Sequence, residues 1–310
     1  MSQTQNLNTE LSEYSFGRIV QAFLNYLTVE AGLSNNTILG YGRDLRDFAI
    51  FCDSNSVKHP DKITTNILYD YSKKLAKQGK AEASINRSVV AIKMFLRFCK
   101  MSGHITDDLT IFLESPKLWQ KLPVICSKDQ VARLIECPDE KEPYFSRDRA
   151  LLELLYATGT RASEVAGLKI GDVNLKIGYI RCFGKGNKER VVPMNKTAVA
   201  AVEQYIQQLR PKLVKPFSGD FLFLSRTGKV LSRIEIWRIV KKYARLTGLS
   251  RQMTTHTLRH CFATHLLSGG ADLRSVQEML GHVDIATTQI YTHVDQDRLR
   301  SIHKKFHPRG

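Results

Sequence analysis

The stretch from residue 256 to residue 291 constrains the fold more than any other part of the chain. Its glycines and apolar spacing predict three consecutive helices: the first ends near Gly270, the second ends at Gly281, and the third carries Tyr291. If Asp284 caps the third helix, Tyr291 lies about two turns into it. The polar residues of this stretch therefore have defined places on helices.

These polar residues are of types that bind phosphate. His256, Arg259 and His260 are three and four positions apart, so they share one helix face. His282 follows directly after a predicted helix end. Arginine matches phosphate oxygens with a bidentate fork, and no carboxylate accompanies this group. We therefore expect a site that receives a phosphate, in which Tyr291 could serve as nucleophile.

The distribution of charge indicates a polyanionic partner. The chain has 310 residues, a length that suggests two domains, and a net charge of +16. Residues 1–115 hold 13 Lys and Arg against 12 Asp and Glu, whereas residues 116–310 hold 33 against 18. Such an excess in one part favours nucleic acid or an acidic membrane surface as partner. The alternative is a charge that only keeps the protein in solution.

The cysteines and the N-terminus indicate a cytoplasmic protein. The six cysteines form no CxxC pair and no framework spacing, so we expect free thiols in a reducing compartment. The N-terminal residues lack the basic and apolar regions of a signal peptide. No apolar run approaches the ~18 residues of a membrane span, so no membrane association is expected.

Periodicity divides the chain into five predicted regions. A polar tail, residues 1–13, precedes an all-helical bundle at residues 14–103, in which apolar residues recur at helical spacing. Residues 104–123 are predicted to be a linker, since prolines bracket a short polar segment there. A mixed α+β domain is expected at residues 124–303, and residues 304–310 form a basic C-terminal tail.

Capping residues and a change of periodicity place the secondary structure. Helix starts are predicted at Ser34, Thr64, Ser84, Ser127 and Ser232.

Residues 178–183 and 189–193 flank a glycine-rich segment and predict a β-hairpin, and residues 221–224 predict a short strand. The expected fold class is mainly α with a small β-hairpin or sheet.

Five segments of the second domain combine the residue types of such a site: Ala157-Thr-Gly-Thr-Arg161-Ala-Ser-Glu164, Gly184-Lys185-Gly186-Asn-Lys188-Glu-Arg190, His256-Thr-Leu-Arg259-His260, Leu280-Gly281-His282 and Thr287-Thr-Gln-Ile-Tyr291. These motifs resemble those of the tyrosine recombinases, the phage-integrase-like family. The ending of the chain, with Tyr291-Thr-His-Val, Arg298-Leu-Arg and His307-Pro-Arg, is most similar to the XerD branch of the Xer chromosome-dimer resolvases. The resemblance covers essentially the whole chain and implies a SAM-like core-DNA-binding bundle followed by a catalytic domain.

Chemistry and resemblance together suggest catalytic roles. A phosphodiester in transfer spreads negative charge over its non-bridging oxygens, and Arg161 and Arg259 are suited to stabilise it. By resemblance, Tyr291 is the nucleophile, and Lys185 donates a proton to the leaving 5′ oxygen. His256 and His282 would hydrogen-bond the phosphate or handle the tyrosine proton, and the general base remains unassigned.

Four further residues have supporting roles. Lys188 and Arg190 are expected to contact the DNA backbone. His260 is a further candidate DNA contact, with a structural role as the alternative. Glu164 follows Arg161 by three residues, and we expect it to orient that arginine or to pack structurally.

The histidines also raise the question of a metal. Histidines four apart, such as His256 and His260, can bind zinc, and His265 lies nearby. The glutamate of an HExxH motif is missing, however, and no cysteine pair adds ligands. We therefore expect neither a metal nor any other cofactor.

The resemblance implies a site-specific recombinase that cuts and rejoins double-stranded DNA through a covalent 3′-phosphotyrosine. It further implies a tetramer, formed alone or with a sister Xer recombinase, that resolves chromosome dimers for segregation at cell division, with a septal DNA translocase as regulator. The alternatives are a phage or mobile-element integrase with the same chemistry and a non-catalytic DNA-binding protein. The basic segment after Tyr291 is expected to dock on a neighbouring subunit, or else to contact DNA or solvent.

Overall fold

The protein divides into two compact units, Met1–Lys121 and Leu122–Gly310, each of which is described by itself. The computed structural model describes residues 9–30, 33–113, 126–184, 189–249, 253–281 and 293–309. No helix in these ranges is long and apolar enough to cross a membrane. The predicted domain boundaries at residues 14, 103 and 124 stay predictions.

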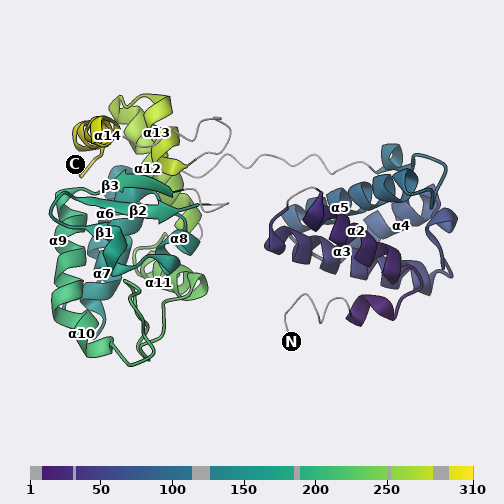
Figure 1. Ribbon diagram of the computed structural model, residues 1–310, viewed down its shortest axis with the longest axis horizontal. Helices are drawn as coiled ribbons and strands as arrows, with labels where there is room; N and C mark the ends of the chain where they lie inside the picture. The colour runs from purple at the N-terminus through teal and green to yellow at the C-terminus, as the bar shows by residue number, and fades with distance from the viewer. Residues whose placement is uncertain are drawn as a thin grey trace. The chain divides into compact units, whose positions relative to one another are not determined.

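The first unit is a helical bundle (Figure 1), and its core includes several aromatic side chains. Its helices are α2 (Gly17–Val29), α3 (Asn35–Ser54), α4 (Thr65–Lys77) and α5 (Glu82–Met101), with single 3₁₀ turns at Pro60–Lys62 and Leu109–Phe112. Helix α3 packs against α2, α4 and α5. The ring centroid of Phe95 lies 6.0 Å from that of Phe16 and 5.7 Å from that of Phe23, and all three rings are shielded from solvent. Burial of these large rings stabilises the bundle.

The helix starts in this unit follow the capping residues with one exception. Ser34 accepts a hydrogen bond from the Thr37 amide, and the Thr64 side chain caps α4 in the same way, as predicted. The fourth helix begins at Glu82, two residues before the predicted Ser84. A carboxylate in the first turn interacts favourably with the helix dipole, so Glu82 extends this helix without a capping side chain.

The second unit is built around a buried central helix, α7 (Phe145–Thr158). Helix α7 packs against α6, α9 and α12, and it is buried on nearly every side, with Arg147, Asp148 and Glu153 buried beside its apolar side chains. The other helices are α6 (Lys128–Glu136), α8 (Ala162–Gly167), α9 (Lys196–Gln204), which continues through a π turn (Tyr205–Leu209) into α10 (Arg210–Leu213), then α11 (Arg233–Leu246), α12 (Thr255–Gly269), α13 (Leu273–Leu280) and α14 (His293–Phe306). The predicted caps Ser127 and Ser232 both form capping boxes.

A three-stranded antiparallel sheet lies beside these helices (Figure 1). Strands β2 (Tyr179–Phe183) and β3 (Glu189–Pro193) form the predicted hairpin, and the two-residue strand β1 (Val173–Asn174) pairs with β2. Strand β3 contacts α7, α13 and α14, so the hairpin is anchored to the C-terminal helices. The mainly helical fold class with a small sheet is confirmed.

The strand predicted at residues 221–224 is wrong. The segment makes only isolated bridges, from Phe221 to Lys169 and from Leu224 to Val230. Its apolar side chains are buried, but other groups take its backbone polar atoms: the Arg210 guanidinium donates to the carbonyls of Phe221 and Leu222. A run of apolar residues therefore indicates that side chains are buried. It occurs in buried loops as well as in strands.

Candidate active site

The turn between α7 and α8 places Arg161. Helix α7 ends at Gly159, which has a left-handed φ of +58° and lies so close to Phe262 that a Cβ there would come within 2.3 Å of the ring. Arg161 then starts α8, where its backbone amide donates to Glu164 Oε2 at 2.7 Å and its Nη1 donates to Oε1 at 3.0 Å. The Arg161 side chain remains 42% exposed. A role of Glu164 in orienting Arg161 requires these contacts between the two residues.

Arg259, in the N-terminal half of α12, binds backbone carbonyls at the C-terminal ends of α7 and α13. Its Nη1 donates to the carbonyl of Gly159 and its Nη2 to the carbonyl of Leu280, both at 2.7 Å. Burial, followed by the positive charge of Arg161, lowers the pKa of Arg259 to about 10, so it stays charged at neutral pH. Arg259 therefore binds the turn that carries Arg161, at a carbonyl two residues before it.

Arg190 has a different environment from the one predicted. Its side chain is 5% exposed, and its Nη1 and Nη2 form a bidentate pair with Glu164 at 3.0 and 2.8 Å. Its Nε donates to the carbonyl of Met279 at 2.9 Å. The expected DNA-backbone contact does not fit this buried arrangement, because Arg190 is bound by protein groups.

Arg161, Arg190 and Arg259 form an arginine cluster: the first two bind the carboxylate of Glu164, and Arg259 binds the backbone carbonyl two residues before Arg161. Burial alone would raise the pKa of Glu164, but hydrogen bonds and charge from Arg190, together with hydrogen bonds from Arg161, hold it below its ordinary value. Glu164 is therefore ionised, and the cluster has three arginines against this one carboxylate. The excess of positive charge, with Arg161 partly exposed, favours binding of an anion such as a phosphate.

The histidines of α12 occupy unlike environments. His256 is exposed at the first turn, whereas His260 is half-buried, and its Nε2 is buried without a hydrogen-bond partner among the described residues. His265 is engaged elsewhere, since its Nδ1 lies 2.8 Å from the Tyr156 hydroxyl and its Nε2 lies 3.0 Å from the Cys126 carbonyl. In the described ranges no three His, Cys, Asp or Glu side chains are grouped to hold a metal ion. A DNA contact by His260 stays a prediction.

Four predicted residues, Lys185, Lys188, His282 and Tyr291, lie outside the described residues. The sequence places Gly281, whose backbone contacts the Arg190 side chain, directly before His282.

The C-terminal helix packs on its own catalytic unit. Leu299 is buried, His303 Nε2 lies 2.7 Å from the Ala157 carbonyl, and Arg309 pairs with Glu136 and Glu153 at 2.9 and 3.0 Å. These contacts are all within one chain, and docking of the segment on a neighbouring subunit stays a prediction. The helix contacts α12, α13 and β3, all of which belong to the same unit.

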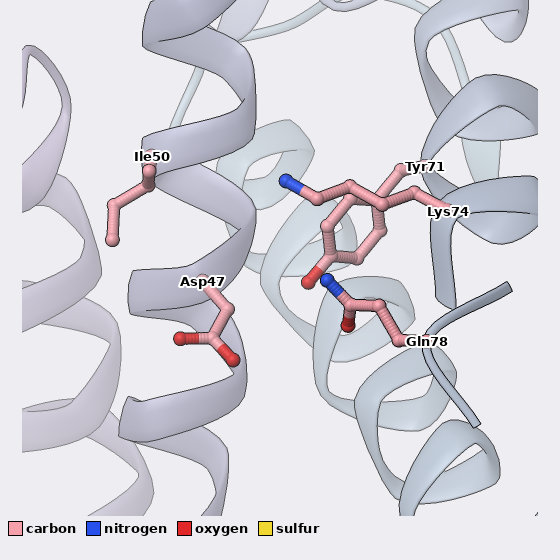
Figure 2. A pocket seen from close by; sticks show the side chains of 5 residues that line it. All are labelled: Asp47, Ile50, Tyr71, Lys74 and Gln78. Carbon is pink, nitrogen blue, oxygen red and sulfur yellow. The ribbon is translucent and has the colours of Figure 1, made fainter. Parts of the chain in front are cut away.

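A pocket of about 220 Å³ lies within the helical unit (Figure 2). It is lined by Asp47 and Ile50 of α3 and by Tyr71, Lys74 and Gln78 at α4, and the last three side chains extend toward α3 in Figure 2. Asp47 is already paired with Lys80 at 3.1 Å. All five lining residues belong to the helical unit.

Sequence reasoning missed the buried position of Arg190, although a signal was present. Residues two apart on a strand face the same side. Val192 belongs to the apolar hairpin and is fully buried, so Arg190 lies on the same inward face. A charged residue at that position indicates a buried partner.

Comparisons with known proteins identify the family. The model of the phage integrase family matches residues 125–298, and that of the phage integrase N-terminal SAM-like domain matches residues 20–103. The chain is 44% identical over 292 residues to the tyrosine recombinase XerD of Staphylococcus epidermidis, an alignment that covers 94% of this chain and 99% of that protein. It is 45% identical to the tyrosine recombinase XerD of Halalkalibacterium halodurans, with 94% and 98% covered.

Solved structures show the same fold. The XerH site-specific recombinase bound to a palindromic difH substrate, in a post-cleavage complex, gives a TM-score of 0.65 at 26% identity, over 85% of this chain and 78% of that chain. A lambda integrase dimer bound to a COC′ core site gives a TM-score of 0.67 at 18% identity, over 91% and 94%, a likeness of fold alone. The chain belongs to the phage integrase family of tyrosine recombinases.

Proposed function

We propose that this chain is a site-specific recombinase that cuts and rejoins double-stranded DNA through Tyr291. The observation that carries the proposal is the arginine cluster, in which Arg161 and Arg190 bind the carboxylate of Glu164 and Arg259 binds the carbonyls of Gly159 and Leu280. Such a cluster, fixed before the substrate arrives, stabilises the charge that develops on a phosphate in transfer.

The proposed reaction exchanges one phosphate ester for another. The phenolic oxygen of Tyr291 attacks phosphorus, the bond from phosphorus to the 5′ oxygen breaks, and a 3′-phosphotyrosyl ester forms. Lys185 donates a proton to the leaving 5′ oxygen. The phenol has an ordinary pKa of about 10, so it needs a proton acceptor, for which His256 and His282 are the candidates. A 5′ hydroxyl from another strand reverses the step without ATP, since the ester conserves the bond.

The proposed substrate is a recombination site in duplex DNA. The XerH structure contains its difH substrate, and the relatives named XerD support the same class of substrate for this chain. We assign the chain to chromosome-dimer resolution at cell division in the cytoplasm. It would act as a tetramer, alone or with a sister Xer recombinase, under the control of a septal DNA translocase. An integrase of a mobile element is the second candidate, since the lambda integrase shares the fold.

A duplex nicked close to the scissile phosphate tests the chemistry, because the short leaving strand diffuses away and the covalent adduct accumulates. We expect the natural chain to form an adduct and Tyr291→Phe to form none while binding DNA equally well. Tyr69→Phe is the control, since Tyr69 is 61% exposed and lies in the helical unit. An adduct in the Tyr291→Phe variant would show that another residue is the nucleophile.

The biological substrate is tested by mapping the protein along chromosomal DNA. Chromosome-dimer resolution predicts one protected site near the replication terminus. Protection at the two ends of a mobile element would instead support the integrase. Recombination by the purified chain alone, compared with a mixture that contains a sister recombinase, decides between a homotetramer and a heterotetramer.

A further inference from the structure

Arg190 connects three segments of the chain that carry predicted catalytic residues. It lies in β3, two residues after Lys188 in the hairpin that contains Lys185. Its Nη atoms bind Glu164, which holds Arg161, and its Nε binds the Met279 carbonyl at the end of α13, three residues before His282. These contacts span 26 and 89 residues of sequence, so Arg190 is a tertiary link.

Glu164 transmits the position of Arg190 to Arg161. Each carboxylate oxygen accepts from both arginines: Oε1 from Nη1 of Arg161 and Nη1 of Arg190, both at 3.0 Å, and Oε2 from the Arg161 amide at 2.7 Å and Nη2 of Arg190 at 2.8 Å. A bidentate fork fixes the plane of a carboxylate. The plane of Glu164 in turn sets both the backbone and the guanidinium of Arg161.

The end of α13 is built to admit Arg190. Gly281 has a left-handed φ of +68°, and a Cβ there would lie 3.0 Å from Arg190 Cδ and 3.2 Å from its Nε. Only glycine satisfies both the conformation and the close approach. Arg259 binds the adjacent Leu280 carbonyl, so two arginines hold consecutive carbonyls immediately before the Gly281-His282 segment.

We propose that Arg190 is a positioning residue, which sets Arg161 through Glu164 and holds the end of α13 where His282 follows. The inference rests on the proposed function, because its consequence is a change in phosphate chemistry. Arg190 itself is buried and acts on the substrate only through the residues that it holds.

The first test separates cleavage from DNA affinity in Arg190→Gln and Arg190→Lys. Single-turnover adduct formation on the nicked duplex should fall by about 10²-fold in Arg190→Gln, since a misplacement of about 1 Å costs about that much. DNA affinity should change by less than about threefold, because backbone phosphates dominate that affinity and Arg190 is buried. Arg190→Lys keeps the charge without the fork, so it should recover only part of the rate, and it replaces Arg190→Gln if the latter does not fold. An unchanged rate in both variants overturns the proposal.

A second substrate distinguishes positioning from general destabilisation. A methylphosphonate at the scissile position replaces one charged non-bridging oxygen with a methyl group, so it needs less stabilisation from Arg161. The loss in Arg190→Gln should be at least tenfold smaller on this substrate. The matched control is Arg147→Gln, since Arg147 is also buried and is paired with Asp148 at 2.7 Å, while its other hydrogen bond goes to the Leu224 carbonyl. Its loss should be equal on both substrates. Equal losses for Arg190→Gln would overturn the proposal.

Two further measurements test the route through Glu164 and the positioning role of Arg190 separately. In a Glu164→Gln background, Arg190→Gln should lower the rate of adduct formation by less than a third of the factor seen in the natural chain, and additive losses would contradict the route through Glu164.

Amide hydrogen exchange tests the link without any reaction. Exchange should accelerate at residues 161–165 and 279–281 in Arg190→Gln and remain unchanged there in Arg147→Gln. If the natural chain forms no adduct, the proposed function fails, while unchanged exchange in Arg190→Gln refutes the positioning role separately.

Discussion

The helical unit and the catalytic unit differ in what they bury. The described core of the helical unit consists mainly of aromatic and aliphatic side chains, and its buried carboxylate Asp44 meets an arginine, Arg87, that remains 47% exposed. The catalytic unit buries both partners of the Arg147–Asp148 and Arg190–Glu164 pairs.

The difference follows from the kind of structure in each unit, which is packed helices in the first and loops and helix ends at the site of the second. Helices of 13 to 20 residues in the first unit pack along apolar stripes, which need no charged contact to set their register. The site of the second unit consists of loops and helix ends, whose backbone groups have no partner within a helix. Buried arginines donate hydrogen bonds to those backbone groups. They hold the segments of the site in place, whereas apolar packing holds the helices of the bundle in place.

The largest expected effect comes from removing a buried carboxylate in each unit. Glu164→Ala leaves Arg190 buried without its anion, and we expect it to lower the free energy of unfolding of its unit by about 3–5 kcal/mol. Asp44→Ala leaves an arginine that can turn to solvent, so about 1 kcal/mol is expected. Urea denaturation of the full chain measures both. Equal losses would mean that the burial of the second partner has no effect.

A second difference is expected below neutral pH. Burial lowers the pKa of His303 to about 4 and lowers the pKa of His307 as well. Below pH ~6.5 the unfolded chain gains a proton that folded His303 does not accept, so stability is complete above that pH and falls toward pH 4. The two histidines of the first unit's described residues, His59 and His104, are exposed.

We therefore expect the catalytic unit to lose about 3 kcal/mol between pH 7 and pH 4, beyond any loss in the helical unit. Thermal unfolding across this range measures the change. The control is His303→Gln, which keeps a side-chain N–H for the Ala157 carbonyl but does not titrate. An identical pH dependence in that variant would show that other groups titrate.

A smaller effect distinguishes two glycines that follow helices. Gly79 has a φ of +63° with open space around it, whereas Gly281 has a similar φ and the Arg190 side chain against it. Gly79→Ala should cost about 1 kcal/mol, because only the backbone is strained. Gly281→Ala should cost about 1 kcal/mol more and should also slow cleavage, since Arg190 must shift. Activity equal to that of Gly79→Ala would argue against the importance of the close approach.

The smallest effect is expected at an exposed ion pair of the catalytic unit. Arg274 and Glu278 are four residues apart on α13 and 3.3 Å apart at Nε and Oε1, but Arg274 is 64% exposed and Glu278 also binds Arg298. Arg274→Ala should change the free energy of unfolding by less than about 0.5 kcal/mol. A loss comparable to that of Glu164→Ala would show that the presence of charge matters more than its burial.

Local sequence signals predicted the helices well where the chain itself supplies the cap. Ser34, Thr64, Ser127 and Ser232 all cap helices at the predicted places. The same signals failed at residues 221–224, where burial of apolar residues was taken for strand pairing. A run of apolar residues indicates that side chains are buried. It does not indicate which groups form hydrogen bonds with the backbone, and these bonds define a strand.

The kind of chemistry could be predicted from the sequence, because arginines, histidines and a tyrosine occur in segments whose residue types and spacing indicate phosphate transfer. Which arginine is exposed and which is buried depends on the folded chain. Arg161 keeps an exposed guanidinium, while Arg190 binds a carbonyl 89 residues away and Arg259 binds one 100 residues away. Burial is set by contacts between segments distant in the chain, so local periodicity cannot assign it to a charged residue.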